Sequence, residues 1–336
     1  MRVAIICPAP AGSRLGNRIT ALRWARMLRE LGHRAFIAGP GPAPRCDLLI
    51  ALHARRSAES VRSSKTGAPA RPVALALTGT DLYVDIHQDA DAARSLALAD
   101  RLIVLHAGAA AELPRRLRGK VALVPQSAPV PARKPGPIAS AFEVAVVAHL
   151  RPEKDPLRAA AAARLLPPAS RIRVVHAGRA LSPQARAEAL CEERENPRYR
   201  WLGEVPLFRA RALIGRARLL AVTSRIEGGA NVVSEAVAAG TPIIASRIPS
   251  MEAILGRAYA GLFPFGDTRA LARLLSRAED EPAFLERLRR RSIDLRPALS
   301  PAREKAGLRA LLAGLALPKA VGRPRRRVRP GASGST

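Results

Sequence analysis

The stretch from Leu219 to Leu255 constrains the fold more than any other part of the sequence. It begins with an apolar run of buried-strand length and continues into a polar turn that contains two adjacent glycines. A helical pattern then runs over 231–239, Gly240 ends it, and a second apolar run follows at 243–245. The spacing predicts a strand, a loop, a helix and another strand, with the glycine pair just before the helix.

The loop before this helix has the properties of an anion site. Free N–H groups and the positive end of the helix dipole attract an anion there, and Gly228 and Gly229 let a ligand approach the backbone. Glu227 and Glu235 flank the same place and would repel a phosphate bound alone. Because a carboxylate can hold the vicinal diol of a sugar, the pattern favours a nucleotide sugar. The structural alternative is a solvated Glu227 on a loop and a Glu235 on a helix surface.

Length and composition indicate a globular two-domain protein. The chain has 336 residues, of which 48% are hydrophobic. No apolar run reaches membrane-spanning length, and the apolar N-terminal segment is too short for a signal peptide. The three scattered cysteines form neither a disulfide framework nor a zinc pattern. We therefore expect a cytoplasmic protein without an integral membrane segment.

The net charge of +29 raises the possibility of nucleic-acid binding. Only six of the 56 basic residues are lysine, and the arginines are spread along amphipathic helices instead of forming one block. The few aromatic residues leave little capacity for base stacking, and no nucleic-acid-binding motif is present. We expect no nucleic-acid partner, and we attribute the charge to solvated helix faces and an anionic small substrate.

The N-terminal half has the pattern of a doubly wound α/β domain. A strand at 2–7 and a glycine-containing loop lead to a helix whose apolar side is predicted to include Ile19, Leu22, Trp24, Leu28 and Leu31. A strand follows at 34–38, and further strands are predicted at 47–52, 73–77, 102–105 and 121–124. Ligands bind at the carboxyl ends of such strands, and arginine suits phosphate. The loop after the first strand could equally be an ordinary exposed loop. The candidates for binding an anionic ligand are Gly12, Arg14, Asn17, Arg18, His53, Arg55, Arg56, Thr78, Thr80 and Asp81.

The C-terminal half repeats this alternation after a linker at 125–141 that is rich in proline and small residues. Long amphipathic helices are predicted at 267–295 and 301–316. Asp89 and Asp91 are interpreted as a helix start, so no metal site is predicted. The predicted domains are 1–137 and 138–296, followed by a C-terminal helix at 297–318 that packs back on the N-terminal domain and a disordered basic tail at 319–336.

The order of these elements, with Glu227 and Glu235 in a Glu-x7-Glu pattern, resembles the retaining glycosyltransferases of the GT-B type. The resemblance covers the chain to about residue 316 and implies two Rossmann-like domains facing a central cleft. It also implies that Glu235 holds the ribose diol of the donor and that Glu227 contacts the donor sugar.

The segment 148–154 corresponds to the Gly-Arg-Leu-x-x-x-Lys motif of that family. Lys154 matches its diphosphate-binding lysine, while His149 stands where the arginine belongs and Arg151 is the candidate to replace that charge. The implied catalytic residues are Glu227, Lys154 and Arg151. The implied donor-binding residues are His149, Arg151, Lys154, Gly203, Glu204, Arg225, Glu227, Gly228, Gly229, Ala230, Asn231, Val232 and Glu235.

A narrower resemblance, to the selenosugar synthases of selenoneine biosynthesis, lies in the ordered segments PAPAGSRLGNRITALRWARML, ALHARRS, LTGTDLY, HLRPEKDPLRAA, NPRYRWLGE and SRIEGGANVVSEAVAAGTPIIASRIP. It implies a UDP-sugar donor (UDP-N-acetylglucosamine or UDP-glucose) and selenophosphate as the acceptor bound by the N-terminal half. The expected functional partners are an enzyme that makes selenophosphate and one that forms selenoneine downstream.

Selenophosphate is anionic and already nucleophilic at selenium, so it calls for cationic groups and not for a strong general base. Lys154 and the helix N-terminus can stabilise the leaving UDP, and no cofactor or metal is implied. Two alternatives remain. One is a GT-B glycosyltransferase with a hydroxyl acceptor in lipid or polysaccharide synthesis, for which Asp81 is the nearest candidate base, and the other is a nucleic-acid-binding protein.

Overall fold

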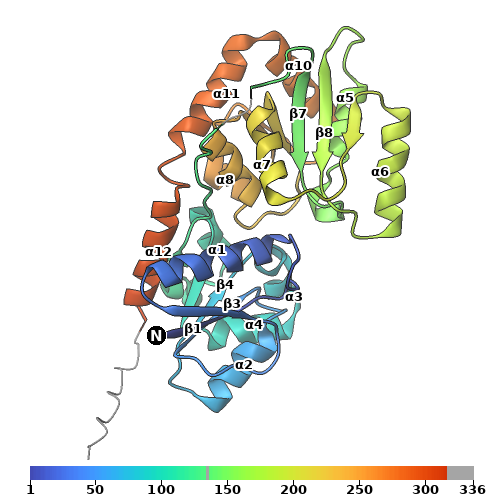
Figure 1. The fold of residues 1–336 in the computed structure, drawn as a ribbon. Coiled ribbons are helices and arrows are strands. Elements are labelled where there is room, and N and C mark those ends of the chain that lie inside the picture. The colour runs from blue at the N-terminus through green and yellow to red at the C-terminus, as the bar shows by residue number, and fades with distance from the viewer. Residues whose placement is uncertain (134–135, 316–336) are drawn as a thin grey trace, which may run out of the picture.

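The computed structural model describes residues 1–133 and 136–315, which form two α/β domains one after the other along the chain (Figure 1). Each domain contains a six-stranded sheet whose paired strands are parallel, with the orders β2-β1-β3-β4-β5-β6 and β12-β11-β10-β7-β8-β9. The predicted fold class, two Rossmann-like doubly wound domains, is confirmed. The predicted tail at 319–336 lies outside the described residues.

The N-terminal sheet has helices on both faces, as a parallel sheet requires. Alternate residues of β1 point to opposite faces: Val3 packs in one core with Trp24 of α1, while Ala4 packs in another with Val61 of α2 and Leu96 of α4. The strands are β1 Arg2–Ile6, β2 Arg34–Ala38, β3 Leu48–Leu52, β4 Val73–Ala76, β5 Arg101–Val104 and β6 Val121–Leu123. The helices are α1 Gly16–Glu30, α2 Ala58–Gly67, α3 Ile86–Gln88 and α4 Ala90–Leu98, with short helical turns η1 Asp81–Asp85, η2 Ala107–Glu112 and η3 Arg115–Lys120.

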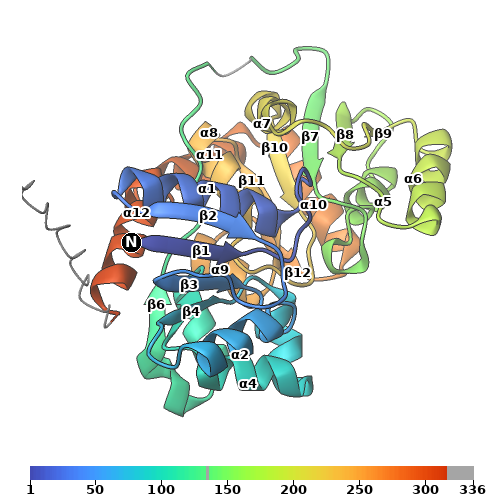
Figure 2. The same ribbon diagram turned by 60° about the horizontal axis from the view of Figure 1, so that its bottom comes forward.

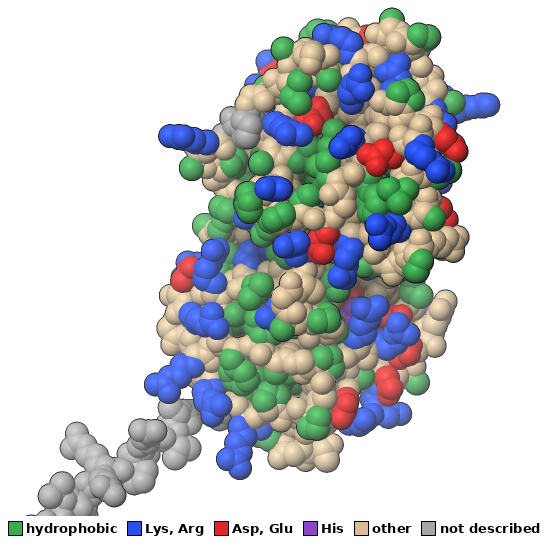
Figure 3. Space-filling view, turned by 45° about the vertical axis from the view of Figure 1, so that its right-hand side comes forward, with side chains coloured by type: hydrophobic (Ala, Val, Ile, Leu, Met, Phe, Trp, Pro, Cys, Tyr) green, Lys and Arg blue, Asp and Glu red, His purple; other side chains and the backbone are tan. Residues whose placement is uncertain are grey.

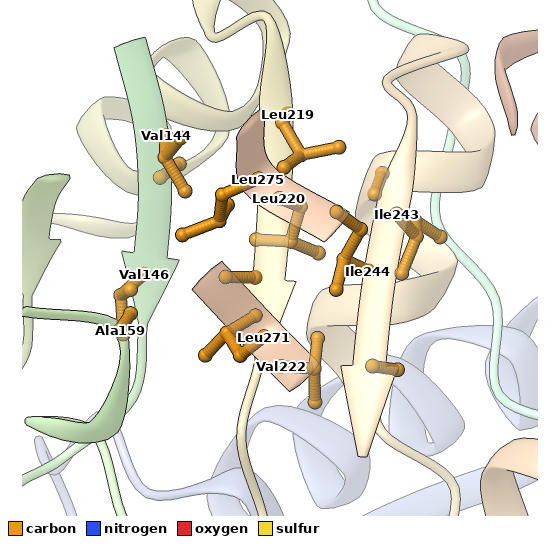
Figure 4. Close-up of a cluster of buried hydrophobic side chains, with 14 of the residues drawn as sticks. Val144, Val146, Ala159, Leu219, Leu220, Val222, Ile243, Ile244, Leu271 and Leu275 are labelled. Atoms are coloured by element: carbon orange, nitrogen blue, oxygen red, sulfur yellow. The ribbon is translucent and has the colours of Figure 1, made fainter. Parts of the chain in front are cut away.

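The C-terminal sheet is buried in the same way. Figure 4 shows Leu220 and Val222 of β10 between β7 and β11, with Leu271 and Leu275 of α10 against them. The strands are β7 Phe142–Val147, β8 Ile172–Ala177, β9 Tyr199–Trp201, β10 Leu219–Val222, β11 Ile243–Arg247 and β12 Leu262–Pro264. The helical segments are η4 Pro152–Lys154, α5 Arg158–Arg164, α6 Pro183–Glu195, α7 Leu207–Arg216, α8 Asn231–Ala239, α9 Pro249–Leu255, α10 Thr268–Asp280, α11 Pro282–Asp294 and α12 Pro301–Ala313.

The predicted strand–loop–helix–strand unit is present as β10, α8 and β11. Gly240 ends α8 with a φ of 65°, a left-handed conformation that glycine adopts at little cost. Asp89 begins α4, as predicted, because its side chain accepts a hydrogen bond from the Ala92 N–H at 2.8 Å.

Two details of the predicted helices are wrong. The segment 267–295 is two helices, α10 and α11, that meet at Glu281, because Pro282 lacks an N–H and is suited to the first turn of a new helix. Leu22 was placed on the apolar side of α1, but its side chain is 52% exposed. The buried stripe of α1 instead includes an arginine, Arg23, beside Trp24.

The helix α12 leaves the C-terminal domain and lies beside α1, as Figures 1 and 2 both show. Leu308 and Leu311 belong to the core that contains Val3 and Trp24. A Cβ on Gly307 would lie only 2.8 Å from the Leu123 carbonyl oxygen, so α12 lies directly against β6. The C-terminal end of the described chain is thus part of the N-terminal core. Among the described residues, no helix is both long and apolar enough to cross a membrane.

Candidate active site

Most candidate residues of the N-terminal half lie in the loops after β1, β3 and β4, while Asn17 and Arg18 lie in the first turn of α1 and Asp81 begins η1. These strands are neighbours in the sheet, so the loops lie together at its carboxyl edge. The opposite side consists of the loops after β7 and β10 and the N-terminus of α8. The two sides touch: a Cβ on Gly228 would lie 2.2 Å from the Thr78 carbonyl oxygen, and one on Gly229 would lie 2.8 Å from atoms of Leu105 and Gln126. Gly228 therefore admits the backbone of the other domain, and Gly229 admits side chains of that domain.

Glu227 is buried, with 6% of its surface exposed, which rules out a solvated loop residue. Its carboxylate accepts a hydrogen bond from Ser224 Oγ at 2.6 Å and lies 2.6 Å from Lys154 Nζ. The loop that carries Lys154 is held in place, because Thr223 Oγ1 donates to the Lys154 and Asp155 carbonyl oxygens at 3.1 and 2.7 Å. The predicted lysine and the first glutamate thus meet directly.

Glu235 is also buried, one helical turn after Asn231 and on the same face of α8. Arg211 of α7 donates from Nε to its carboxylate at 3.0 Å. Burial raises the pKa of Glu235, while Arg211 and Arg23 act in the opposite direction. Arg23 also donates from Nη1 to Asn231 Oδ1 at 3.0 Å, which joins α1 of the N-terminal domain to the start of α8.

Non-glycine residues with left-handed backbone angles lie in the candidate loops. The φ angles are 76° at His53, 40° at Asp155 and 46° at Ala230. Such angles cost free energy and are held by surrounding contacts, and they are common where a loop must present a ligand site. Ala230 directly precedes α8, and Asp155 directly follows Lys154.

His149 lies beside the backbone of Arg14, across the domain boundary, and accepts a hydrogen bond from the Arg179 N–H at 3.1 Å. Burial lowers the pKa of His149, so it does not supply the charge of the family arginine. Arg151 lies nearby with a buried Nε that has no hydrogen-bond partner among the described residues. Arg14 Nη1 is 4.0 Å from Glu204 Oε2, so a predicted acceptor residue and a predicted donor residue meet across the boundary.

Three further donor candidates are Gly203, Arg225 and Val232. Val232 is half-buried in the first turn of α8, Gly203 has a φ of 64°, and Arg225 is exposed with its N–H bonded to the Glu153 carbonyl oxygen at 2.9 Å.

Several acceptor candidates are engaged by neighbouring groups. His53 Nε2 lies 3.2 Å from Thr80 Oγ1 and 3.7 Å from the Asp85 carboxylate, and burial lowers the pKa of His53. Arg55 Nε is 3.4 Å from the same carboxylate of Asp85. Arg18 has a buried Nε without a partner among the described residues. Arg56 is exposed, and its backbone N–H donates to His53 Nδ1 at 3.4 Å. Gly12 is exposed and Asn17 is half-buried, and neither makes such a contact among those residues.

Asp81 is surrounded by backbone N–H groups that bind its carboxylate. It is fully buried, and its carboxylate accepts hydrogen bonds from the N–H groups of Thr78 and Gly79 at 2.8 Å and of Ala54 at 3.0 Å. These bonds tie the loop after β3 to the loop after β4. The carboxylate is fully enclosed and bonded to backbone groups, so it is not presented to an incoming acceptor. Asp81 is therefore poorly suited to the role of general base that the hydroxyl-acceptor alternative gave it.

The sequence analysis missed Arg23, Arg211 and Glu304. Glu304 of α12 accepts from Arg23 Nε at 2.9 and 2.8 Å, from Trp24 Nε1 at 2.7 Å, and from Ser127 Oγ. The sequence contains one indication of a buried ion pair, because Arg23 occupies a position on the buried stripe of α1 where an apolar residue is expected. A charged side chain there needs a buried partner, but the sequence does not say which element provides it.

Residues 132–294 match the family model of the group 1 glycosyl transferases. The matched part includes Lys154, Glu227 and Glu235. A search of the curated proteins gives no match to the sequence.

Several solved structures are similar over nearly their whole length. Sucrose-phosphate synthase from Thermosynechococcus elongatus is 17% identical with a TM-score of 0.73, covering 93% of this chain and 98% of that one. HepE from Anabaena, in complex with UDP-glucose, is 14% identical with a TM-score of 0.75, covering 94% and 100%. A trehalose 6-phosphate synthase from Burkholderia multivorans is 14% identical with a TM-score of 0.71, covering 93% and 96%. The chain thus has the two-domain GT-B fold, and its C-terminal half matches the group 1 glycosyl transferases.

Proposed function

We propose that this protein is a glycosyltransferase that binds a UDP-sugar between its two domains. The observation that carries the proposal is the 2.6 Å contact between Lys154 and Glu227 beside the N-terminus of α8, with Glu235 one turn into that helix. A cation and free N–H groups suit a diphosphate, and buried carboxylates suit the hydroxyls of ribose and hexose. The HepE complex with UDP-glucose supports a UDP-sugar as the donor.

We further propose that selenophosphate is the acceptor. Selenium attacks the anomeric carbon, a carbon–selenium bond forms, and the carbon–oxygen bond to UDP breaks with its electron pair leaving on UDP. Arginines support an anionic acceptor: Arg14, Arg55 and Arg56 in the loops after β1 and β3, and Arg18 in the first turn of α1. Lys154 and the start of α8 stabilise the leaving UDP, a role for which no metal ion is required. The direct product is a sugar whose selenium still carries the phosphoryl group, and hydrolysis of the P–Se bond by water then gives the selenosugar and phosphate. The selenosugar is a precursor of selenoneine, and another enzyme supplies the selenophosphate.

The basic surface has no concentrated patch on the face in Figure 3, where Lys and Arg side chains are spread over both domains among hydrophobic ones. This distribution favours a small anionic substrate over the nucleic-acid alternative, which calls for clustered charge.

The direct test is incubation of the protein with selenophosphate and either UDP-N-acetylglucosamine or UDP-glucose, followed by mass spectrometry. We expect a selenium-bearing sugar, recognised by its isotope pattern, and an equal amount of UDP. A parallel reaction contains glucose 6-phosphate, because some structural neighbours are sugar-phosphate synthases. Transfer to glucose 6-phosphate without transfer to selenophosphate would establish the hydroxyl-acceptor alternative instead.

Replacing Glu235 with alanine should weaken the binding of UDP itself by about 1–3 kcal/mol, because a buried charged acceptor for the ribose diol is lost. Isothermal titration calorimetry with UDP measures the change. The matched control is Glu143→Ala, which removes another buried, arginine-paired carboxylate, bonded to Arg216 at 2.7 and 2.8 Å. Equal UDP affinity in Glu235→Ala and wild type would contradict the ribose assignment.

Replacing Arg18 with alanine should raise the KM for selenophosphate by about 10–100-fold and leave UDP binding unchanged, since one charged hydrogen bond is worth about 1.5–3 kcal/mol. Arg26→Ala, on the exposed side of the same helix and paired with Glu30, is the control. Initial rates at varied selenophosphate concentrations give both KM values. An unaltered KM in Arg18→Ala would remove this arginine from the acceptor site.

A further inference from the structure

A second polar group lies between the two domains, outside the residues assigned so far. Tyr83 of η1 has its hydroxyl oxygen 3.0 Å from Nε2 of His106, which follows β5. Ser250, at the start of α9 in the C-terminal domain, lies beside the Tyr83 hydroxyl. The domains are in close contact here, because a Cβ on Gly108 would lie 3.0 Å from the Cβ of Ala253 in α9. Tyr83, His106 and Ser250 are called the Tyr83 cluster below.

The cluster contains a buried polar atom without a partner. His106 is 4% exposed, and its Nδ1 forms no hydrogen bond with any residue that the structure describes. Ser250 is fully buried, and its hydroxyl has the Tyr83 hydroxyl as its neighbour. Buried polar atoms are almost always bonded, and leaving one unbonded costs free energy. The unbonded His106 Nδ1 in a group of polar side chains indicates that a polar molecule or substituent binds there.

The cluster is uncharged. Burial lowers the pKa of His106 to about 4, and burial raises the pKa of Tyr83 well above its usual value. A neutral imidazole and a phenol that share one hydrogen bond keep one further N–H or O–H to donate. The carboxylates of Glu112 and Glu227 also raise the pKa of Tyr83. A Cβ on Gly229 would lie 2.8 Å from Leu105, the residue before His106, so the cluster adjoins the loop that carries Glu227. Neutral donors beside a carboxylate suit a hydroxyl or an amide, whereas a phosphate would be repelled.

We propose that the Tyr83 cluster binds an uncharged polar substituent of the donor sugar, a hydroxyl or an acetamido group, and thereby determines which UDP-sugar is used. This inference rests on the proposed function, in which Glu227 contacts the hexose. Tyr83 and His106 come from the N-terminal domain and Ser250 from the C-terminal domain, so the sugar is held from both sides. UDP alone, which lacks the hexose, does not reach the cluster.

The test is calorimetric binding of UDP, UDP-glucose and UDP-N-acetylglucosamine in the absence of any acceptor. Tyr83→Phe removes only the hydroxyl, and we expect about tenfold weaker binding of the UDP-sugar with UDP affinity unchanged. Ser250→Ala should act in the same direction. Tyr199→Phe is the matched control, because Tyr199 forms a similar pair with His176, at 2.7 Å, within the C-terminal sheet. It should alter neither affinity.

The outcomes separate this inference from the proposed function. If wild type binds a UDP-sugar and Tyr83→Phe keeps the wild-type ratio of UDP-sugar to UDP affinity, the cluster does not contact the sugar and only this inference fails. If wild type binds no UDP-sugar, both fail. A larger loss for UDP-N-acetylglucosamine than for UDP-glucose assigns the cluster to the acetamido group, and equal losses assign it to a hydroxyl that both sugars share.

Discussion

Replacing Lys154 with alanine is expected to lower the rate of sugar transfer by about 10²–10³-fold, because a preorganised charge that stabilises the leaving diphosphate is worth about 3–4 kcal/mol in a buried site. The lysine has 17% of its side chain exposed and lies 2.6 Å from Glu227, so its position is set before the donor binds. Single-turnover release of UDP from a UDP-sugar measures the loss.

The control for Lys154→Ala is Lys65→Ala. Lys65 has a similarly shielded side chain, 16% exposed, and forms an ion pair with Asp100 at 2.7 Å, remote from the domain boundary. Its replacement should leave turnover near the wild-type rate. A Lys154→Ala variant that is folded and retains more than a tenth of the wild-type rate would mean that the α8 N-terminus and arginines stabilise UDP without this lysine.

Replacing Glu304 with glutamine is expected to destabilise the N-terminal domain by about 3–5 kcal/mol, the usual cost of removing one partner from a buried ion pair. Glu304 is fully buried and binds Arg23, Trp24 and Ser127, so the variant leaves a buried guanidinium without its carboxylate. The control is Glu192→Gln, which breaks an ion pair with Arg164 that is partly exposed. It should cost less than about 1 kcal/mol.

The two tryptophans allow the domains to be followed separately. Trp24 donates to Glu304 in the N-terminal core, and Trp201 lies in β9 of the C-terminal sheet. In a Trp201→Phe background, urea unfolding monitored by tryptophan fluorescence therefore reports on the N-terminal domain. A Glu304→Gln midpoint close to that of the background would show that the ion pair contributes little to stability.

The strands could be predicted well because a parallel strand covered on both faces has to be an uninterrupted apolar run, as 219–222 is. Helices were predicted less accurately at their ends and in their orientation. Pro282 indicates the break between α10 and α11, because proline cannot continue a helix, but the prediction did not use this signal. The burial of Leu22 and Arg23 was harder to predict, because it depends on which elements pack against each side of α1.

The residues of the proposed donor side could be predicted to lie together because they are close in the sequence. Glu227, the glycine pair and Glu235 belong to one loop and the helix that follows it, so local geometry alone brings them to one place. The residues that contact the two glutamates could not be predicted from local spacing. Arg211 reaches Glu235 from the preceding helix, and Lys154 reaches Glu227 from a loop 73 positions earlier in the chain.

Local periodicity and short-range spacing predict the two Rossmann-like domains, a helix start suited to an anion and the pair of glutamates. The sequence does not show that α12 completes the N-terminal core through Glu304, that Asp81 is held by three N–H groups, or that the Tyr83 cluster spans both domains. Each of these depends on which buried polar group meets which partner. That pairing is set by the packing of distant elements, and the free energy of burying an unbonded polar group makes it specific.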